Sequence, residues 1–183
     1  MSATNRGSKR IESDFYATPK SCIQNLLTHY GNINGVVLEP SAGNGNIVSV
    51  LKQNGNNHVV ALELREEEFE QLKQIADEVI TGDFLKFIPT QKYDYIIGNP
   101  PYSKAQEFME KCFEIASEDT VIIMLLRTAF LESKKRYNFW QNHPVNKLYV
   151  LSQRPSFTGK GTDATSYSWF VWDNSKKQEI HVI

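Results

Sequence analysis

The sequence has few cysteines and no long apolar run, and these two shortages exclude several classes of protein. Its two cysteines, Cys22 and Cys112, are too few for the disulfide framework of a small secreted protein and lack the spacing of metal ligands. Both fall in stretches with helical spacing, so we expect buried thiols and no metal site. No apolar run approaches the roughly 20 residues of a membrane span, and residues 1–10 lack the apolar core of a signal peptide. We therefore expect an intracellular, cytoplasmic protein.

An excess of charge of one sign is also missing, since 20 basic and 21 acidic side chains leave a formal net charge of −1. A nearly neutral chain gives no overall sign of nucleic-acid binding, so any such surface must be local. The 183 residues, 40% of them hydrophobic, are enough for one domain with a sizeable core. We expect a flexible basic arm over residues 1–13 and a single domain over residues 14–183.

Short apolar runs alternate with stretches of helical spacing along most of the chain. Thr18 and Pro19 are typical of a helix N-cap followed by proline at the first helical position. We expect helices from there to about residue 30 and over 46–53, 65–76 and 105–117. We expect strands over 36–39, 59–62 and 79–80, one ending at Gly98, and others over 121–126, 148–152 and 167–172. This alternation predicts an α/β fold with a mostly parallel sheet, helices on both faces and an antiparallel C-terminal hairpin.

The first four expected strands all run into polar or glycine-containing segments. These segments are the glycine loop at 39–46, Glu63, Asp83 and Asn99. Because ligands of an open α/β sheet bind outside the carboxyl ends of its strands, we expect all four at one edge.

Each of the first three segments also has a plainer interpretation. Gly43 and Gly45 let the backbone approach a ligand closely, without the lysine of a triphosphate loop, but a lone pair of glycines also suits a helix cap. Glu63 could accept both hydroxyls of a ribose, or be a solvated acid in an acidic stretch. Asp83 and Phe84 offer an acceptor and an apolar face to an adenine, or the aspartate could simply cap a helix.

The sequence Asn99-Pro100-Pro101-Tyr102 follows the fourth strand. Two prolines make the turn stiff, so that it presents two acceptors, the Asn99 side-chain oxygen and the Pro100 carbonyl, beside the Tyr102 ring. This group suits a planar molecule that carries an –NH2 group. Accepting both N–H hydrogens returns the lone pair of a delocalised amine to its nitrogen, so that positioning replaces a strong general base. A structural strand-to-loop turn is the alternative.

Together these segments resemble the class I S-adenosylmethionine-dependent methyltransferases that methylate amino groups, specifically the N6-adenine branch, in a small form without a separate target-recognition domain. The resemblance runs from residue 14 to about residue 172 and implies a Rossmann-like fold with a seven-stranded sheet. By this resemblance Asn99 and Pro100 bind the target amine, Pro101 completes the motif and Tyr102 stacks on the base. The implied S-adenosylmethionine-binding residues are Tyr16, Thr18, Pro19, Glu39, Pro40, Ser41, Gly43, Gly45, Glu63, Leu64, Asp83, Phe84 and Asn99.

The resemblance favours DNA as the substrate but leaves alternatives. Family members that act on specific DNA sequences usually carry a target-recognition domain, whereas only a short stretch separates Asp83 from Asn99 here. We therefore expect specificity to be low, or to come from loops, a partner subunit or a homodimer. The first alternative is adenine in RNA, and the second is the side-chain amide of a protein glutamine. The others are cytosine N4 and a catalytically silent subunit that binds nucleic acid.

Residues 127–160 form a block in which basic and aromatic side chains are interleaved. Phosphates are neutralised by basic residues and bases stack on aromatic rings, so this pattern favours a nucleic-acid surface. A solvated helix whose aromatic rings pack inward is the alternative. The nucleic-acid-binding residues that we expect are Lys134, Lys135, Arg136, Arg154, Phe157 and Lys160.

Overall fold

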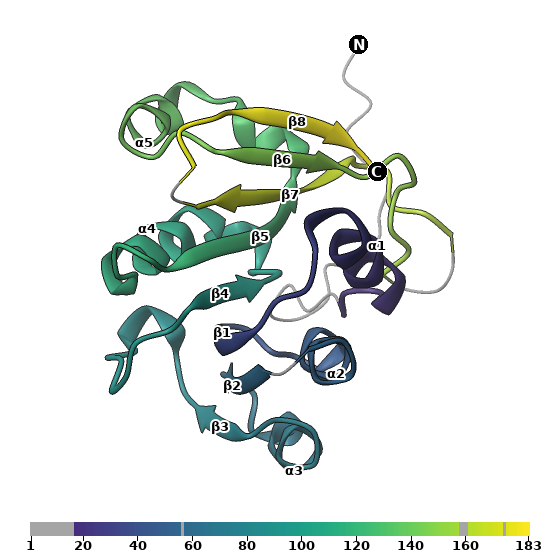
Figure 1. Cartoon of the computed structure of the whole chain (residues 1–183), viewed down its shortest axis with the longest axis vertical. Helices are drawn as coiled ribbons and strands as arrows, with labels where there is room; N and C mark the ends of the chain where they lie inside the picture. Colours follow the sequence, from purple (N-terminus) through teal and green to yellow (C-terminus); the bar gives the residue numbers. More distant parts are fainter. Residues whose placement is uncertain (1–16, 56, 158–160, 174) are drawn as a thin grey trace.

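The centre of the molecule is an eight-stranded sheet with the strand order β3-β2-β1-β4-β5-β7-β6-β8 (Figure 1). The computed structural model describes residues 17–55, 57–157, 161–173 and 175–183, so the expected basic arm, Tyr16 and Lys160 lie outside the described residues. The strands are β1 (Gly35–Glu39), β2 (Asn57–Glu63), β3 (Glu78–Thr81), β4 (Tyr95–Gly98), β5 (Val121–Arg127), β6 (Lys147–Val150), β7 (Tyr167–Trp172) and β8 (Glu179–Val182).

Strands β1 to β5 pair with one another in parallel, while β7 is antiparallel to both β5 and β6. The α/β class, the mostly parallel sheet and the antiparallel hairpin of β6 and β7 are thereby confirmed. The expectation of seven strands is wrong, because β8 adds an eighth beside β6. Its side chains Ile180 and Val182 are 75% and 72% exposed, so the strand has no buried apolar run that sequence patterning could detect.

Helices cover both faces of the sheet, as expected (Figure 1). On one face lie α1 (Lys20–Tyr30), α2 (Asn46–Gln53) and α3 (Phe69–Lys73), and on the other lie α4 (Ala105–Ile115) and α5 (Tyr137–Asn142). The expected bounds of α2 are confirmed. Helix α3 is shorter than the expected 65–76, because its acidic start is a 3-10 turn, Glu66–Glu68. The assignment of Thr18 as N-cap is wrong, because Pro19 occupies that position without a side-chain cap.

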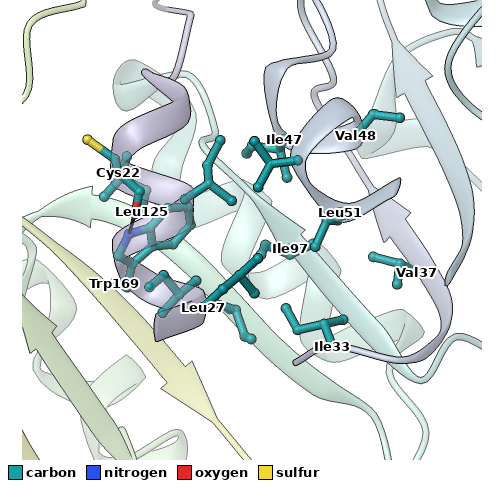
Figure 2. Packing of buried hydrophobic residues seen from close by; sticks show 14 of the residues in the cluster. Cys22, Leu27, Ile33, Val37, Ile47, Val48, Leu51, Ile97, Leu125 and Trp169 are labelled. Atoms are coloured by element: carbon teal, nitrogen blue, oxygen red, sulfur yellow. Dashed lines mark hydrogen bonds between the residues drawn. The ribbon is translucent and has the colours of Figure 1, made fainter. Parts of the chain in front are cut away.

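The two faces of the sheet form two buried layers of side chains. On the α1 and α2 face, Leu27 and Leu51 pack with Ile97, Leu125 and Trp169 from the sheet (Figure 2). On the other face, side chains of α4 and α5 pack against the sheet. Burying both faces fixes the register of the strands, since a slip of one residue would move every side chain to the wrong layer.

Both cysteines belong to these layers and are buried thiols, as the sequence predicts. The Trp169 indole N–H donates to the Cys22 carbonyl oxygen at 3.2 Å, and burial raises the pKa of the Cys22 thiol to about 11. Burial also raises the pKa of Cys112. Within the described residues, no helix is long and apolar enough to cross a membrane.

Candidate active site

The carboxyl ends of the parallel strands meet at one edge of the sheet, which we call the rim. Glu39 pairs with Ala61 across β1 and β2, and Glu63 pairs with Thr81 across β2 and β3. The segment after β4 lies at the same edge, because β4 is parallel to β1. The structure therefore brings together the four segments that the sequence places at strand ends.

The glycine loop between β1 and α2 folds back over the end of β2. The Ala42 amide donates to the Leu62 carbonyl at 2.9 Å, and the Gly43 amide donates to Glu63 Oε2 at 2.6 Å. Gly43 and Gly45 have φ values of 55° and 76°, a conformation that residues with a Cβ adopt at a cost. Gly45 is also the N-cap of α2, so the same loop starts the helix and presents its backbone at the rim.

This loop contacts the Asn99 motif directly. The Ser41 hydroxyl donates to the Asn99 carbonyl oxygen at 3.3 Å. Pro40 lies against Gly98, where an added Cβ would be 3.2 Å from the Pro40 Cδ. A ligand held by the loop is therefore held beside the motif.

Glu39 and Glu63 are two buried acids at the ends of neighbouring strands, with exposed fractions of 1% and 7%. Burial raises the pKa of Glu39 well above its usual value; the Val48 amide, which donates to it at 3.2 Å, opposes this rise, and the charge of Glu63 adds to it. Glu63 Oε1 accepts from both the amide and the side-chain Nε of Arg65, each at 3.0 Å. Glu63 is thus not the solvated acid of the alternative interpretation.

The segment after β3 differs from expectation in one side chain. Asp83 Oδ1 accepts from the Leu85 amide at 3.0 Å, which is the capping role of the plainer interpretation. The Phe84 ring is 2% exposed and packs against Phe108 with ring centroids 5.0 Å apart. It belongs to the core, so the expected apolar face for an adenine is not at the rim. Leu64, 59% exposed, presents an apolar side chain there instead.

The start of the described chain is tied to the glycine-loop helix. The Thr18 carbonyl accepts from the Asn46 side-chain amide at 2.9 Å, and Lys20 Nζ donates to the Ser49 hydroxyl at 3.1 Å. Pro19 lies between these two contacts and precedes α1. Thr18 and Pro19 therefore lie beside the start of α2.

Within the Asn99 motif, Pro100 is buried and Asn99 half-buried, and the chain turns from Pro101 into a 3-10 turn, Tyr102–Lys104. The Tyr102 ring belongs to an aromatic cluster with Phe157 and Tyr167, whose centroids lie 6.3 and 5.5 Å from it. Burial and Tyr167 raise the pKa of Tyr102, and a hydrogen bond with Asn99 opposes the rise. The Phe157 ring therefore lies beside that of Tyr102.

The basic segment after β5 divides into exposed lysines and a structural arginine. Lys134 and Lys135 are exposed, as is Arg154 on a separate loop. The Arg136 Nε donates to the Phe130 carbonyl at 2.8 Å, and its guanidinium also donates to the carbonyls of Ala129 and Glu132. These contacts give Arg136 a role in closing the preceding turn, which differs from the expected nucleic-acid contact.

The aromatic residues of this segment mostly pack inward. Phe139 is 6% exposed, and the Trp140 ring stacks against Phe170 and Trp172. For these two rings the inward-packing alternative holds, whereas Tyr137 is 62% exposed. Only the exposed side chains of the segment can contact a nucleic acid without rearrangement.

Three further residues at the rim lie outside the expected site. Arg127, the last residue of β5, lies over the Tyr102 ring at 4.8 Å, and Tyr167 and Arg65 contact Tyr102 and Glu63 as described above. The position of Arg127 at the end of a parallel strand was a usable signal. Tyr167 gave none, because it begins an antiparallel strand far away in the sequence.

No protein-family model matches the chain, but curated relatives do. It is 31% identical over 207 aligned residues to Type II methyltransferase M.CvrRI of Paramecium bursaria Chlorella virus XZ-6E, covering 88% of this chain and 55% of that protein. It is 31% identical over 106 residues to Type II methyltransferase M.HincII of Haemophilus influenzae, covering 56% of this chain and 20% of that protein. The chain thus spans about half of the first relative and about a fifth of the second.

Solved structures agree on the fold. A dimethyladenosine transferase from Plasmodium falciparum superposes with a TM-score of 0.68 at 15% identity, over 87% of this chain and 63% of that one. Together with the strand order and the antiparallel β7, this similarity identifies the Rossmann-like class I methyltransferase fold.

Proposed function

We propose that this chain, which has the class I methyltransferase fold and is related in sequence to Type II methyltransferases, transfers a methyl group from S-adenosylmethionine to the N6 amine of adenine in DNA. The observation that carries the proposal is the direct contact between the glycine loop and the amine-binding motif, from the Ser41 hydroxyl to the Asn99 carbonyl at 3.3 Å. This contact puts a cofactor-type loop beside two acceptors that suit a planar –NH2 group.

The rim suits S-adenosylmethionine in charge and shape. Glu39 is the acid for the cationic amino-acid end and Glu63 the acid for the ribose hydroxyls, and both are held in place by backbone amides. Leu64 offers an apolar side chain to the adenine ring. Asp83, which follows the neighbouring strand β3, is the expected hydrogen-bond acceptor for the adenine. Gly45 has a φ of 76°, a conformation that favours glycine and that gives the loop its shape. When bound, the cofactor supplies an electrophilic methyl group on a sulfonium.

The protein's own part in the reaction is to hold the amine. The Asn99 side-chain oxygen and the Pro100 carbonyl accept the two N–H hydrogens, which draws the nitrogen lone pair out of the ring and aims it at the methyl carbon. The nitrogen–carbon bond forms as the carbon–sulfur bond breaks, sulfur keeps the electron pair, and the amine loses one proton to solvent. Tyr102 supports the base ring, which must first leave the duplex stack.

The nucleic acid is held by the exposed lysines that follow β5 and by the loop with Arg154 and Phe157. Lys134 and Lys135 are exposed on the 3-10 turn that precedes α5, so we expect each to neutralise one phosphate. The double variant Lys134→Gln/Lys135→Gln should lower the slope of log affinity against log salt by about two units. The matched control is Lys176→Gln/Lys177→Gln, two adjacent exposed lysines before β8, at the opposite edge of the sheet. Equal slopes for the two double variants would remove these lysines from the interface.

Target specificity, in this proposal, comes from the loops at the rim, from a partner subunit or from a second copy of the chain. Activity measured against protein concentration separates a second copy from the loops. Specific activity that rises with concentration indicates a second copy, and constant specific activity with low sequence preference indicates the loops alone.

The test of the proposal is transfer of label from S-adenosylmethionine to unmethylated duplex DNA, single-stranded DNA, total RNA and a protein extract. The variant Asn99→Ala removes an amine acceptor. Its control is Asn146→Ala, which removes another half-buried amide, one that is hydrogen-bonded to residues 173 and 175 at the opposite edge of the sheet. Label in DNA that Asn99→Ala alone abolishes supports the proposal. Label only in RNA or only in protein contradicts the choice of DNA, and cofactor binding without any transfer contradicts the activity.

A further inference from the structure

We propose that Arg127 is a positioning residue for the methyl transfer: it fixes the Tyr102 ring against Tyr167 so that one face of the ring is presented to the target base. The inference rests on the proposed function and adds a residue that the amine-binding motif does not contain. Arg127 ends β5, the strand next to β4, so it lies at the rim beside the motif.

The Arg127 guanidinium contacts two members of the aromatic cluster at once. It lies over the Tyr102 ring, 4.8 Å from the centroid, which is within the range of a cation–π interaction. It also lies beside Tyr167, its register partner in β7, and although burial opposes the change, the interaction with Tyr167 raises the pKa of Arg127. Arg127 and Tyr167 are paired across β5 and β7, so the sheet itself keeps these two residues side by side.

The same tyrosine is connected to the loop that carries Phe157. The Tyr167 hydroxyl donates to Asp163 Oδ2 at 3.2 Å, and the Asp163 amide donates to the Pro155 carbonyl at 3.0 Å. The Phe157 ring lies 5.0 Å from that of Tyr167. Tyr102 and Phe157, an expected nucleic-acid-binding residue, therefore both pack against Tyr167. Arg127 is the only cation among the described contacts of this cluster.

The geometry suits a brace better than a direct ligand of the base. A guanidinium over one face of a ring leaves the opposite face for stacking, and its planar fork can keep a hydrogen bond to a neighbour while it stacks. A lysine at this position keeps the charge over the ring but loses the fork. We therefore expect Arg127→Lys to retain part of the function and Arg127→Gln to lose it.

The experiment compares the full chain with Arg127→Gln and Arg127→Lys in steady-state methylation of unmethylated genomic DNA, together with calorimetric binding of S-adenosylhomocysteine. Arg127→Gln should lower kcat/KM for DNA about tenfold and leave S-adenosylhomocysteine affinity unchanged, with Arg127→Lys in between. The control is Lys147→Gln, which removes a cation that lies 5.7 Å from the Tyr30 ring and pairs with Asp173. It lies at the opposite edge of the sheet, so it should leave both quantities unchanged.

A double-mutant cycle shows whether Arg127 acts through the ring. In a Tyr102→Ala background Arg127→Gln should cause no further loss of activity, because coupled residues are not additive. Additive losses, or no loss from Arg127→Gln alone, would overturn the assignment.

The same cycle measured by urea unfolding does not depend on activity. If the wild-type chain methylates no nucleic acid, the proposed function fails. Coupling between Arg127 and Tyr102 in the unfolding free energies would then still support the brace, and absence of coupling would overturn it as well.

Discussion

Replacing Gly45 in the glycine loop should destabilise the fold, because this residue combines a positive φ with a close neighbour. In Gly45→Ala the new Cβ meets the Ile75 Cδ1 at 2.3 Å and the Leu72 Cδ2 at 3.0 Å. The φ of 76° places the residue in the left-handed region, which costs an alanine about 1–2 kcal/mol. The contact with Ile75 adds to this cost, although the atom is the end of a flexible side chain.

We expect Gly45→Ala to lower the free energy of unfolding by about 1–3 kcal/mol, and the melting temperature by about 2–10 °C for a chain of this size. Gly82→Ala is the matched control, because Gly82 follows β3 at the same rim and no atom lies within 4 Å of its added Cβ. That control should change the unfolding free energy by less than about 1 kcal/mol.

The two causes of the loss can be separated. Ile75→Val removes the clashing methyl. The double variant Gly45→Ala/Ile75→Val should therefore regain the stability lost to the clash, but not the stability lost to the left-handed backbone conformation. Urea unfolding of the four variants, with and without S-adenosylhomocysteine, measures both the stability and the stabilisation by ligand. If Gly45→Ala were as stable as Gly82→Ala, the conformation assigned to the loop would be wrong.

Three other changes test separate parts of the structure. Arg65→Met removes a donor that occupies Glu63 Oε1, so S-adenosylhomocysteine affinity should rise several-fold in calorimetry; lower affinity would mean that Arg65 orients the acid instead. The pKa of Glu39 is raised in the folded protein, so the fold binds more protons than the unfolded chain and loses stability as pH rises above about 4.5. Glu39→Gln should flatten that decline in urea unfolding measured across pH, and an unchanged pH profile would contradict it. Ser133 has a φ of 134°, so Ser133→Gly should raise the free energy of unfolding by about 1 kcal/mol. A lower free energy of unfolding would show that the hydrogen bond from the Lys135 amide to the Ser133 hydroxyl matters more.

The sequence predicts the features that depend on local pattern. The glycine loop starts a helix at Asn46 and the Asn99 motif follows a strand that ends at Gly98, because proline and glycine limit the backbone wherever they occur. Their meeting at one rim follows from parallel strands alone.

The features that the sequence does not predict depend on contacts between distant segments. Phe84 follows a strand like a rim residue, but its ring turns into the core against Phe108. Arg136 has the composition of a phosphate contact, yet three carbonyls of the preceding turn accept from its guanidinium. Tyr167 reaches Tyr102 only because β7 lies beside β5. In each case the partner, and not the residue type, decides the role.

Asn99 and its motif should hold an adenine N6 amine for methylation, and the identity of the methylated nucleoside reports this role. Unmethylated DNA is incubated with S-adenosylmethionine and either the wild-type chain or Asn99→Ala, then digested to nucleosides for mass spectrometry. We expect N6-methyladenine from the wild type and a loss of at least about a hundredfold in Asn99→Ala, on the order of removing one transition-state hydrogen-bonding group. N4-methylcytosine as the product, or N6-methyladenine formed equally well by Asn99→Ala, would contradict it.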